Sequence, residues 1–367
     1  MRIQFFMRYY GAYHQSFYFR NPDVAALPYD EHLDRVLDDL LTWPGLVMRR
    51  LREAGHEAEF VLVNARPLQY AWASEHGVRF GSDWLLHVGL EQVRAFRPDA
   101  LIVGSLFHHK GAYMQELREL CGAMFAWIAS PHPPDLDVSV FDCILTSHRN
   151  FAREFRAAGT PAEILLPSFE PRILDRVGRV KRDVPLSFVG GITSAHERRR
   201  RIVKALVART PIEIWGYGEL KPWRVTGVRS ALRRIWATYS SPGLNSRHRG
   251  AAWGKDMYRV LCRSLMTLNV HGEVAGGLAG NMRMFEATGA GALLLTESAP
   301  NLGDMFEPDK EVVTYRHVDE LIDKIEYYLE HPSERERIAA AGQHRALTQH
   351  TTAKRGAEIV RIMERYR

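Results

Sequence analysis

Cysteine is scarce in this chain: its 367 residues include three, Cys121, Cys143 and Cys262. Their spacing fits neither a Cys-x-x-Cys redox pair nor a zinc site, and the first two stand beside apolar runs, where buried free thiols are common. The sequence therefore predicts neither a disulfide framework nor a structural zinc, and it favours a reducing compartment.

Long apolar runs, internal repeats and low-complexity tracts are also missing. The apolar residues 1–7 are interrupted by Arg2 and are too few for a signal peptide or a membrane span, so they are predicted to form a strand. With 46% hydrophobic and 25% charged residues, the composition is that of a globular protein. The length is sufficient for two domains with separate cores.

The net charge of +6 is concentrated in one segment. Residues 219–252 contain seven Lys and Arg against one Glu, and the rest of the chain is close to neutral. A compact basic segment suits an anionic acceptor, a membrane surface or a nucleic acid, and a solvated insertion explains it equally well. The scarcity of cysteine favours a cytoplasmic protein, and peripheral contact with the inner face of the membrane through this segment is left open.

Strands and helices alternate through the first half. Strands are predicted at Arg2–Met7, 57–63, 100–105, 124–130, 141–147 and 163–167, with helices over 30–54 and Trp84–Phe96. Alternation of this kind predicts a doubly wound domain with a parallel sheet. Residues 8–20 are predicted as an aromatic loop after the first strand, where Tyr9, Tyr10, Tyr13 and His14 either stack on a substrate or pack onto the domain.

A charged stretch without periodicity, residues 172–183, is predicted to link two domains, residues 1–175 and 176–347. The second domain begins with a strand over 185–189, followed by Gly190 and Gly191 and by a helix with a Ser194–Glu197 capping box. This arrangement suits a phosphate, and Arg198 is a candidate to reach it. Gly216, after a strand at 212–215, and Lys255, in the first turn of another helix, are weaker candidates for the same ligand.

The rest of the chain is organised around residues 271–297, HGEVAGGLAGNMRMFEATGAGALLLTE. Three glycines lead into a short helix over 281–288, which stops at Gly289 before an apolar strand. Such a helix offers unpaired N–H groups to an anion. Arg283 and Glu286 share one face, suited to a polar ligand, and Met282, Phe285 and Gly289 lie on a face suited to packing.

The segment NMRMFEATGAGALLLTE and the helices that follow it resemble the donor-binding half of GT-B-fold glycosyltransferases, in particular the spore-maturation-type, family 1-like group. The resemblance is strongest over residues 250–355. It implies two Rossmann-like doubly wound domains that face a central cleft, and a final helix over 348–367 that crosses back to the first domain.

The resemblance also implies roles for individual residues. Glu286 matches the glutamate that holds the ribose hydroxyls of the donor, and the start of its helix faces the diphosphate. Arg283 suits the phosphates because a guanidinium group can bind two oxygens at once, and Asn281 either contacts the donor or only caps the helix. The family's upstream glutamate corresponds to Leu278, so Glu273 is the carboxylate available to contact the sugar. Members of this group stabilise the leaving group with helix dipoles and basic side chains, which implies catalysis without a metal or another cofactor.

Three functions are compatible with these features. The first is a glycosyltransferase that moves a sugar from a nucleoside-diphosphate donor, with UDP favoured over GDP, to a hydroxyl of a glycan, a lipid-linked or a small-molecule acceptor; DNA is a further option. The second is a nucleotide-sugar epimerase on the same fold, and the third is a non-catalytic nucleotide- or glycan-binding module. The glycosyltransferase is favoured. We expect Glu286→Ala to weaken donor binding with little loss of folding.

A base for the acceptor hydroxyl is expected from the loops of the first domain. Candidates are His14, His108, His109, His132 and Asp135. His109 and His132 are preferred because they follow neighbouring strands at the same edge of the predicted sheet.

Overall fold

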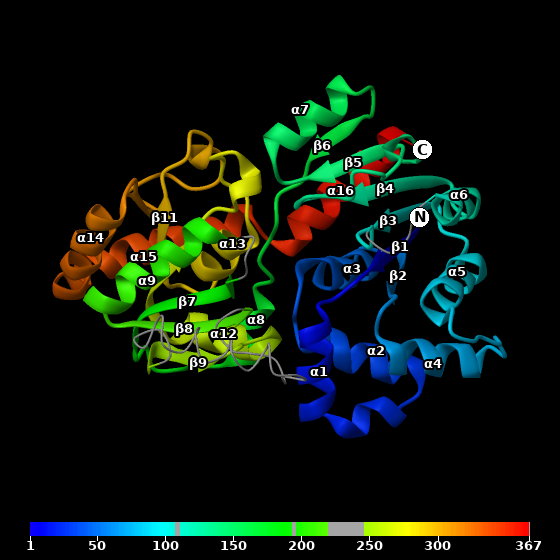
Figure 1. The fold of residues 1–367 in the computed structure, drawn as a ribbon, viewed down its shortest axis with the longest axis horizontal. Helices are drawn as coiled ribbons and strands as arrows, with labels where there is room; N and C mark the ends of the chain where they lie inside the picture. Colours follow the sequence, from blue (N-terminus) through cyan, green and yellow to red (C-terminus); the bar gives the residue numbers. More distant parts are fainter. Residues whose placement is uncertain (107–110, 193–195, 219–245, 367) are drawn as a thin grey trace, which may run out of the picture. The chain divides into compact units, whose positions relative to one another are not determined.

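The computed structural model describes residues 1–106, 111–192, 196–218 and 246–366 (Figure 1). The chain divides into two compact units. Unit 1 comprises Met1–Pro167 and Thr352–Arg367, and unit 2 comprises Ser168–Thr351. The sequence places these divisions at 175/176 and 347/348, a few residues away from the structural ones.

Unit 1 contains a six-stranded sheet in the order β2-β1-β3-β4-β5-β6, in which neighbouring strands run parallel. The strands are β1 (Arg2–Met7), β2 (Glu57–Leu62), β3 (Ala100–Val103), β4 (Ala123–Trp127), β5 (Cys143–Thr146) and β6 (Ala162–Ile164). The helices are α1 (Gly11–Arg20), α2 (Tyr29–Leu37), α3 (Trp43–Glu53), α4 (Arg66–Glu75), α5 (Trp84–Phe96), α6 (Ala112–Glu119), α7 (Arg149–Ala157) and α16 (Thr352–Tyr366). The C-terminal helix α16 packs on α3 within this unit.

Unit 2 contains a second parallel sheet, in the order β12-β11-β10-β7-β8-β9. Its strands are β7 (Val184–Ile192), β8 (Ile212–Gly218), β9 (His248–Gly250), β10 (Ser264–Asn269), β11 (Leu293–Glu297) and β12 (Val313–Tyr315). The helices are α8 (Arg172–Val177), α9 (Glu197–Arg209), α12 (Gly254–Arg263), α13 (Met282–Gly289), α14 (Val318–Glu330) and α15 (Pro332–Gln349). Helix α9 packs with α14, and α13 packs with α12 and α15.

Each sheet contains strands that are buried along their whole length. In β3 of unit 1 and in β11 of unit 2 every residue is buried, which is the pattern of parallel strands covered by helices on both faces. The core of unit 2 combines β7, β8, β10, β11 and β12 with the apolar stripes of α9, α14 and α15. The doubly wound α/β fold predicted from the sequence is therefore confirmed.

Four local predictions are wrong. Residues 11–20 form the helix α1 instead of a loop, because Tyr13 and Phe17 are one helical turn apart and bury the same face. The predicted linker begins with the helix α8. Strand β7 continues through Gly190 and Gly191, and β8 continues through Gly216, since residues 190–192 pair with 216–218.

The start of α9 also differs from the prediction. The helix begins at Glu197 with His196 as its N-cap residue, so Glu197 is the first helical residue instead of the third. Ser194, the other half of the predicted capping box, lies outside the described residues. Among the residues that the structure does describe, no helix has the length and apolar character needed to cross a bilayer.

The close approach of α13 to Phe169 provides a test of the packing. A Cβ atom at Gly289 would lie 2.2 Å from Cγ of the Phe169 ring, which is fully buried. We expect Gly289→Ala to lower the free energy of unfolding by about 1–3 kcal/mol through overpacking, measured by thermal or urea unfolding. Gly303→Ala is the matched control, because a Cβ atom there meets nothing within 4 Å. Equal stability of the two variants would contradict the packing described here.

Candidate functional site

The order of strands in unit 2 identifies one place on the sheet where a ligand site is expected. The chain proceeds from β7 outwards to β8 and β9, and then returns to the other side of β7 with β10. In open α/β sheets, ligands bind at the carboxyl ends of the two strands where the winding direction changes. Here those ends are Ile192 of β7 and Asn269 of β10.

Helix α13 starts near this point because the preceding loop turns sharply. Gly276 and Gly277 have φ angles of 59° and 81°, a region that favours glycine. The helix buries Met284 and Phe285, and Phe285 packs edge-on against His350 at 5.0 Å. Its opposite face carries the two residues that the sequence singled out, Arg283 and Glu286.

Arg283 and Glu286 form an ion pair, with Nη1 and Oε2 2.8 Å apart. Arg283 Nε also donates to the carbonyl of Val189 in β7, at 3.1 Å. The Glu286 carboxylate is buried; burial raises its pKa, and the neighbouring Arg283 and a hydrogen bond with Tyr258 act in the opposite direction. The pair thus fixes a buried carboxylate beside the carboxyl end of β7 and is not a solvated surface pair.

Arg199 is a site residue that the sequence did not single out. Its Nη1 donates to the carbonyl of Gly191 at 2.8 Å and its Nη2 to the carbonyl of Val270 at 3.3 Å, so it bridges the ends of β7 and β10. Burial lowers its pKa, and Arg283 nearby acts in the same direction. Its Nε atom is buried and has no hydrogen-bond partner among the described residues. Four consecutive arginines point around a helix, so the sequence alone had no signal to separate Arg199 from Arg198.

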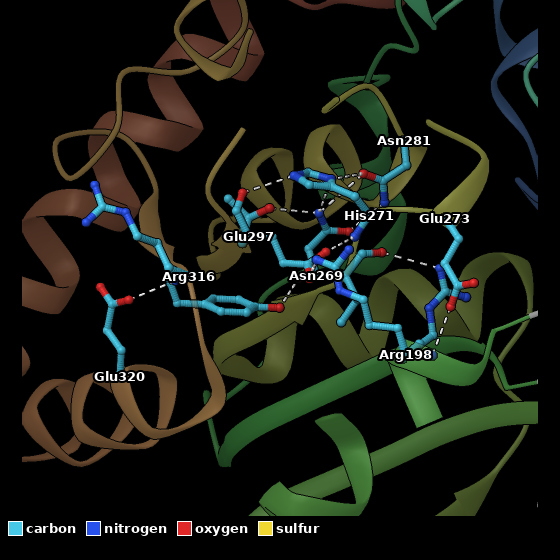
Figure 2. A network of polar contacts seen from close by, with 12 residues as sticks. Arg198, Asn269, His271, Glu273, Asn281, Glu297, Arg316 and Glu320 are labelled. Carbon is cyan, nitrogen blue, oxygen red and sulfur yellow. Dashed lines mark hydrogen bonds and ion pairs between the residues drawn. The ribbon is translucent and has the colours of Figure 1, made fainter. Parts of the chain in front are cut away.

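Arg198 belongs to a network of polar contacts that links three elements (Figure 2). Its Nη2 pairs with Oε1 of Glu297, the last residue of β11. The other carboxylate oxygen, Oε2, accepts a hydrogen bond from the backbone N–H of His271 at 2.7 Å. His271 Nδ1 in turn lies 3.2 Å from Oδ1 of Asn281, the N-cap residue of α13. Arg198 thus joins the site through Glu297 and keeps its side chain nearly half exposed.

Glu273 lies in the same network, and its contact with a donor sugar stays a prediction. Its Oε1 accepts a hydrogen bond from the backbone N–H of Arg198 at 2.9 Å. A carboxylate at this position caps α9 and complements the positive end of its dipole. The position of the family's upstream glutamate, Leu278, is half-buried.

The four remaining donor candidates of unit 2 are three glycines of the sheet and one lysine. A Cβ atom at Gly191 would lie 2.9 Å from the Tyr217 ring, so the position requires glycine for packing. The carbonyl of Gly216 contacts His248 Nε2 at 3.0 Å. Lys255 lies half-buried in the first turn of α12. Gly190, Gly191 and Gly216 therefore serve the pairing of β7 with β8 in the structure, and their contact with a donor stays a prediction.

The candidate bases of unit 1 differ in whether the structure describes them and in what surrounds them. His108 and His109 lie outside the described residues. His132 follows β4, is half-buried, and has its Nδ1 3.1 Å from the carbonyl of Pro133. Burial lowers the pKa of His14, whose Nε2 donates to Oδ1 of Asn64 at 3.2 Å.

Asn64 is the second residue that the sequence did not single out. It also holds the backbone of Tyr9, accepting from its N–H at 3.0 Å and donating to its carbonyl at 2.8 Å. Tyr9 and Tyr13 are buried against one another, whereas Tyr10 is 55% exposed. Of the aromatic residues expected to stack on a substrate, only Tyr10 therefore presents its ring to solvent.

One Asp-x-Asp sequence, the pattern by which many sugar transferases bind a metal, occurs at Asp135–Asp137. Asp137 caps the short helix Val138–Val140, with Oδ1 accepting from the N–H of Ser139 at 3.0 Å. This hydrogen bonding lowers the pKa of Asp137. In the described parts of the chain, His, Cys, Asp and Glu form no group of three or more that could hold a metal ion.

The glycosyl transferase-like family matches residues 198–361, which include most of the site described above. A search of curated proteins finds no match.

Among solved structures, Anabaena HepE in complex with UDP and glucose has a TM-score of 0.61 at 11% identity, with both chains covered completely. A glycosyltransferase from Rickettsia africae has a TM-score of 0.60 at 9% identity, covering 99% of this chain and 98% of the other. Sucrose-phosphate synthase from Thermosynechococcus elongatus has a TM-score of 0.57 at 11% identity, covering 88% of this chain and 92% of the other.

These structures share the GT-B fold, whereas the narrower spore-maturation-type grouping stays a prediction. With residues 198–361 matching the glycosyl transferase-like family, the chain is a glycosyltransferase of the GT-B fold.

Proposed function

We propose that this glycosyltransferase takes its sugar from a uridine-diphosphate donor bound at the carboxyl ends of β7 and β10, and transfers it to an acceptor hydroxyl without a metal ion. The observation that carries the proposal is the meeting of Arg199, Arg283 and Glu286 at the point where the winding of the sheet changes direction. A nucleoside diphosphate presents a matching set of groups, a vicinal diol and two phosphates.

Glu286 is the residue proposed to accept the ribose hydroxyls. An ionised carboxylate accepts two hydrogen bonds from a vicinal diol, and hydrogen bonds to a charged group are stronger than neutral ones. Arg283 and Tyr258 hold the carboxylate from the protein side and favour its ionised form. The group is thus fixed in orientation before the donor arrives, which reduces the entropy cost of binding.

The diphosphate is proposed to lie against Arg199, Arg283 and the first turn of α13. The half-buried guanidinium groups of Arg199 and Arg283 repel each other, and a bound anion would relieve this repulsion. The N–H groups of a helix start add the favourable end of a dipole. Together these groups supply the positive charge that other transferases take from a metal ion.

UDP is preferred over GDP for the donor because HepE, whose chain this one matches over its full length, binds UDP and glucose. At 11% identity this likeness supports the choice of base without naming the sugar. The acceptor is proposed to be a glycan, a lipid-linked or a small-molecule hydroxyl, with His132 or His109 as the base. Most of the basic segment 219–252 lies outside the described residues, so its contact with a membrane or DNA stays a prediction.

Binding of nucleotides tests the proposal first. UDP should raise the melting temperature of the protein more than GDP, ADP or TDP, because a ligand that binds only the folded state stabilises it by mass action. Glu286→Gln keeps the shape of the side chain and removes its charge, and it should weaken UDP binding by about ten- to hundredfold. Alanine is less suitable here, since removing a buried partner of Arg283 costs about 3–5 kcal/mol of stability. Glu286→Ala is therefore expected to destabilise the fold as well as to weaken donor binding, unlike the small loss of folding expected from the sequence.

Glu53→Gln is the matched control for that variant. Glu53 pairs with Arg50 at 2.9 Å in the same i,i+3 geometry, but on α3 and about half exposed. It should leave UDP affinity unchanged within twofold. Equal affinities of the Glu286→Gln variant and the wild type would contradict the assignment of the ribose contact.

The affinity for UDP should also depend on pH. Burial raises the pKa of Glu286 above the ordinary value of 4.5, and only the ionised form accepts two hydroxyls. Affinity is therefore expected to be full near neutral pH and to be lost as the pH falls through the raised pKa, with a midpoint above 4.5. Calorimetric titration of UDP between pH 5 and 8 measures this, and the Glu286→Gln variant should show a flatter profile. A wild-type profile as flat as that of the variant would contradict the proposal.

Sugar transfer should persist without divalent cations. Once a donor and an acceptor are identified, the rate in excess EDTA should equal the rate in added Mg²⁺ or Mn²⁺ within twofold. A loss of activity in EDTA that Mn²⁺ restores would show that a metal, and not the arginines and helix N-terminus, neutralises the leaving group.

A further inference from the structure

The N-cap residue of α13, Asn281, does not cap its own helix. Asparagine is among the most favoured N-cap residues because its side-chain oxygen accepts a hydrogen bond from the second or third N–H of the helix. The backbone of Asn281 has the usual extended N-cap conformation, with φ −83° and ψ 152°, yet its side chain makes no such hydrogen bond.

The side chain is instead held by Asn269 at the end of β10 (Figure 2). Asn281 Nδ2 donates to Asn269 Oδ1 at 2.5 Å, and Asn269 Nδ2 donates back to Asn281 Oδ1 at 3.3 Å. Both polar ends of the Asn281 amide are therefore engaged by one partner, and the ring of His271 lies against the same oxygen.

Asn269 is itself rigidly placed. It is 2% exposed, and its Nδ2 also donates to the hydroxyl of Thr296 in β11 at 2.9 Å. Its backbone carbonyl accepts a hydrogen bond from the Tyr315 hydroxyl of β12 at 3.0 Å. Strand β11 thus holds the side-chain amide of Asn269, and β12 holds its backbone.

We propose that Asn269 is a positioning residue that keeps the Asn281 side chain away from the first turn of α13 and so leaves the N–H groups of Met282 and Arg283 to the donor diphosphate; the N–H of Met284 donates to the Asn281 carbonyl. The inference rests on the proposed function, because it concerns the same phosphate position. Without Asn269, the contact with His271 alone restrains the Asn281 amide. The amide then rotates to cap the helix, and the phosphate must displace a hydrogen bond within the protein.

A double-mutant cycle on UDP binding tests this proposal. Calorimetry on the full chain compares the wild type, Asn269→Ala, Asn281→Ala and the double variant. Asn269→Ala should weaken UDP binding by about fivefold when Asn281 is present, the equivalent of a typical N-cap hydrogen bond. In the Asn281→Ala background the same change should alter the affinity by less than twofold, since no side chain is left to cap the helix.

Amide hydrogen exchange without ligand gives a second, independent measurement. Exchange in the first turn of α13 should be slower in Asn269→Ala than in the wild type, and this slowing should be absent from the double variant. A merely structural role of Asn269 would speed exchange in both variants.

The outcomes separate this inference from the proposed function. Equal losses of UDP affinity in both backgrounds, or no slowing of exchange in Asn269→Ala, would overturn the role of Asn269 alone. A wild type that binds no UDP would overturn the proposed function, and the exchange measurement would then decide whether Asn269 controls the cap.

Discussion

Holding charge at the carboxyl end of a parallel sheet is the constraint on which the second unit depends. Glu286 and Glu297 are buried there, and a buried charge is tolerated only when it is paired or hydrogen-bonded. Glu286 pairs with Arg283, Glu297 pairs with Arg198, and Glu273 accepts from the start of α9. Arg199 is satisfied differently, by the carbonyls of Gly191 and Val270. These contacts connect α9, α13 and the ends of β7, β10 and β11.

Much of the fold could be predicted from the sequence, because its strands are short apolar runs and its helices have clear apolar stripes. The predicted helix Trp84–Phe96 and the strand Arg2–Met7 match the structure residue for residue. Residues 8–20 are wrongly predicted as a loop because their mixture of aromatic and polar residues is typical of surface segments, although Tyr13 and Phe17 are buried. The sequence predicts that the two strands end before Gly190 and Gly216, because glycine is frequent in turns. In the structure, β7 and β8 pair through Gly190, Gly191 and Gly216.

The site was predictable to the extent that its residues are close in sequence. Arg283 and Glu286 are three residues apart in one helix, so their contact follows from helical geometry. Arg199 reaches Val270 across 71 positions of the chain, and Asn269 reaches Asn281 across a loop. Such contacts depend on tertiary packing, and no local sequence pattern predicts them. The same holds in the first unit for Asn64, which fixes the backbone of Tyr9 from 55 residues away.

Hydrogen–deuterium exchange of the whole chain with and without UDP tests the central claim most directly, because it locates a ligand without assuming which residues bind it. Since the diphosphate would bind the helix N-terminus and the ribose would bind Glu286, UDP should slow exchange in the first turn of α13 and at the ends of β7 and β10. Slower exchange confined to other segments, or none at saturating UDP, would contradict the assignment of the donor site to this edge of the second sheet.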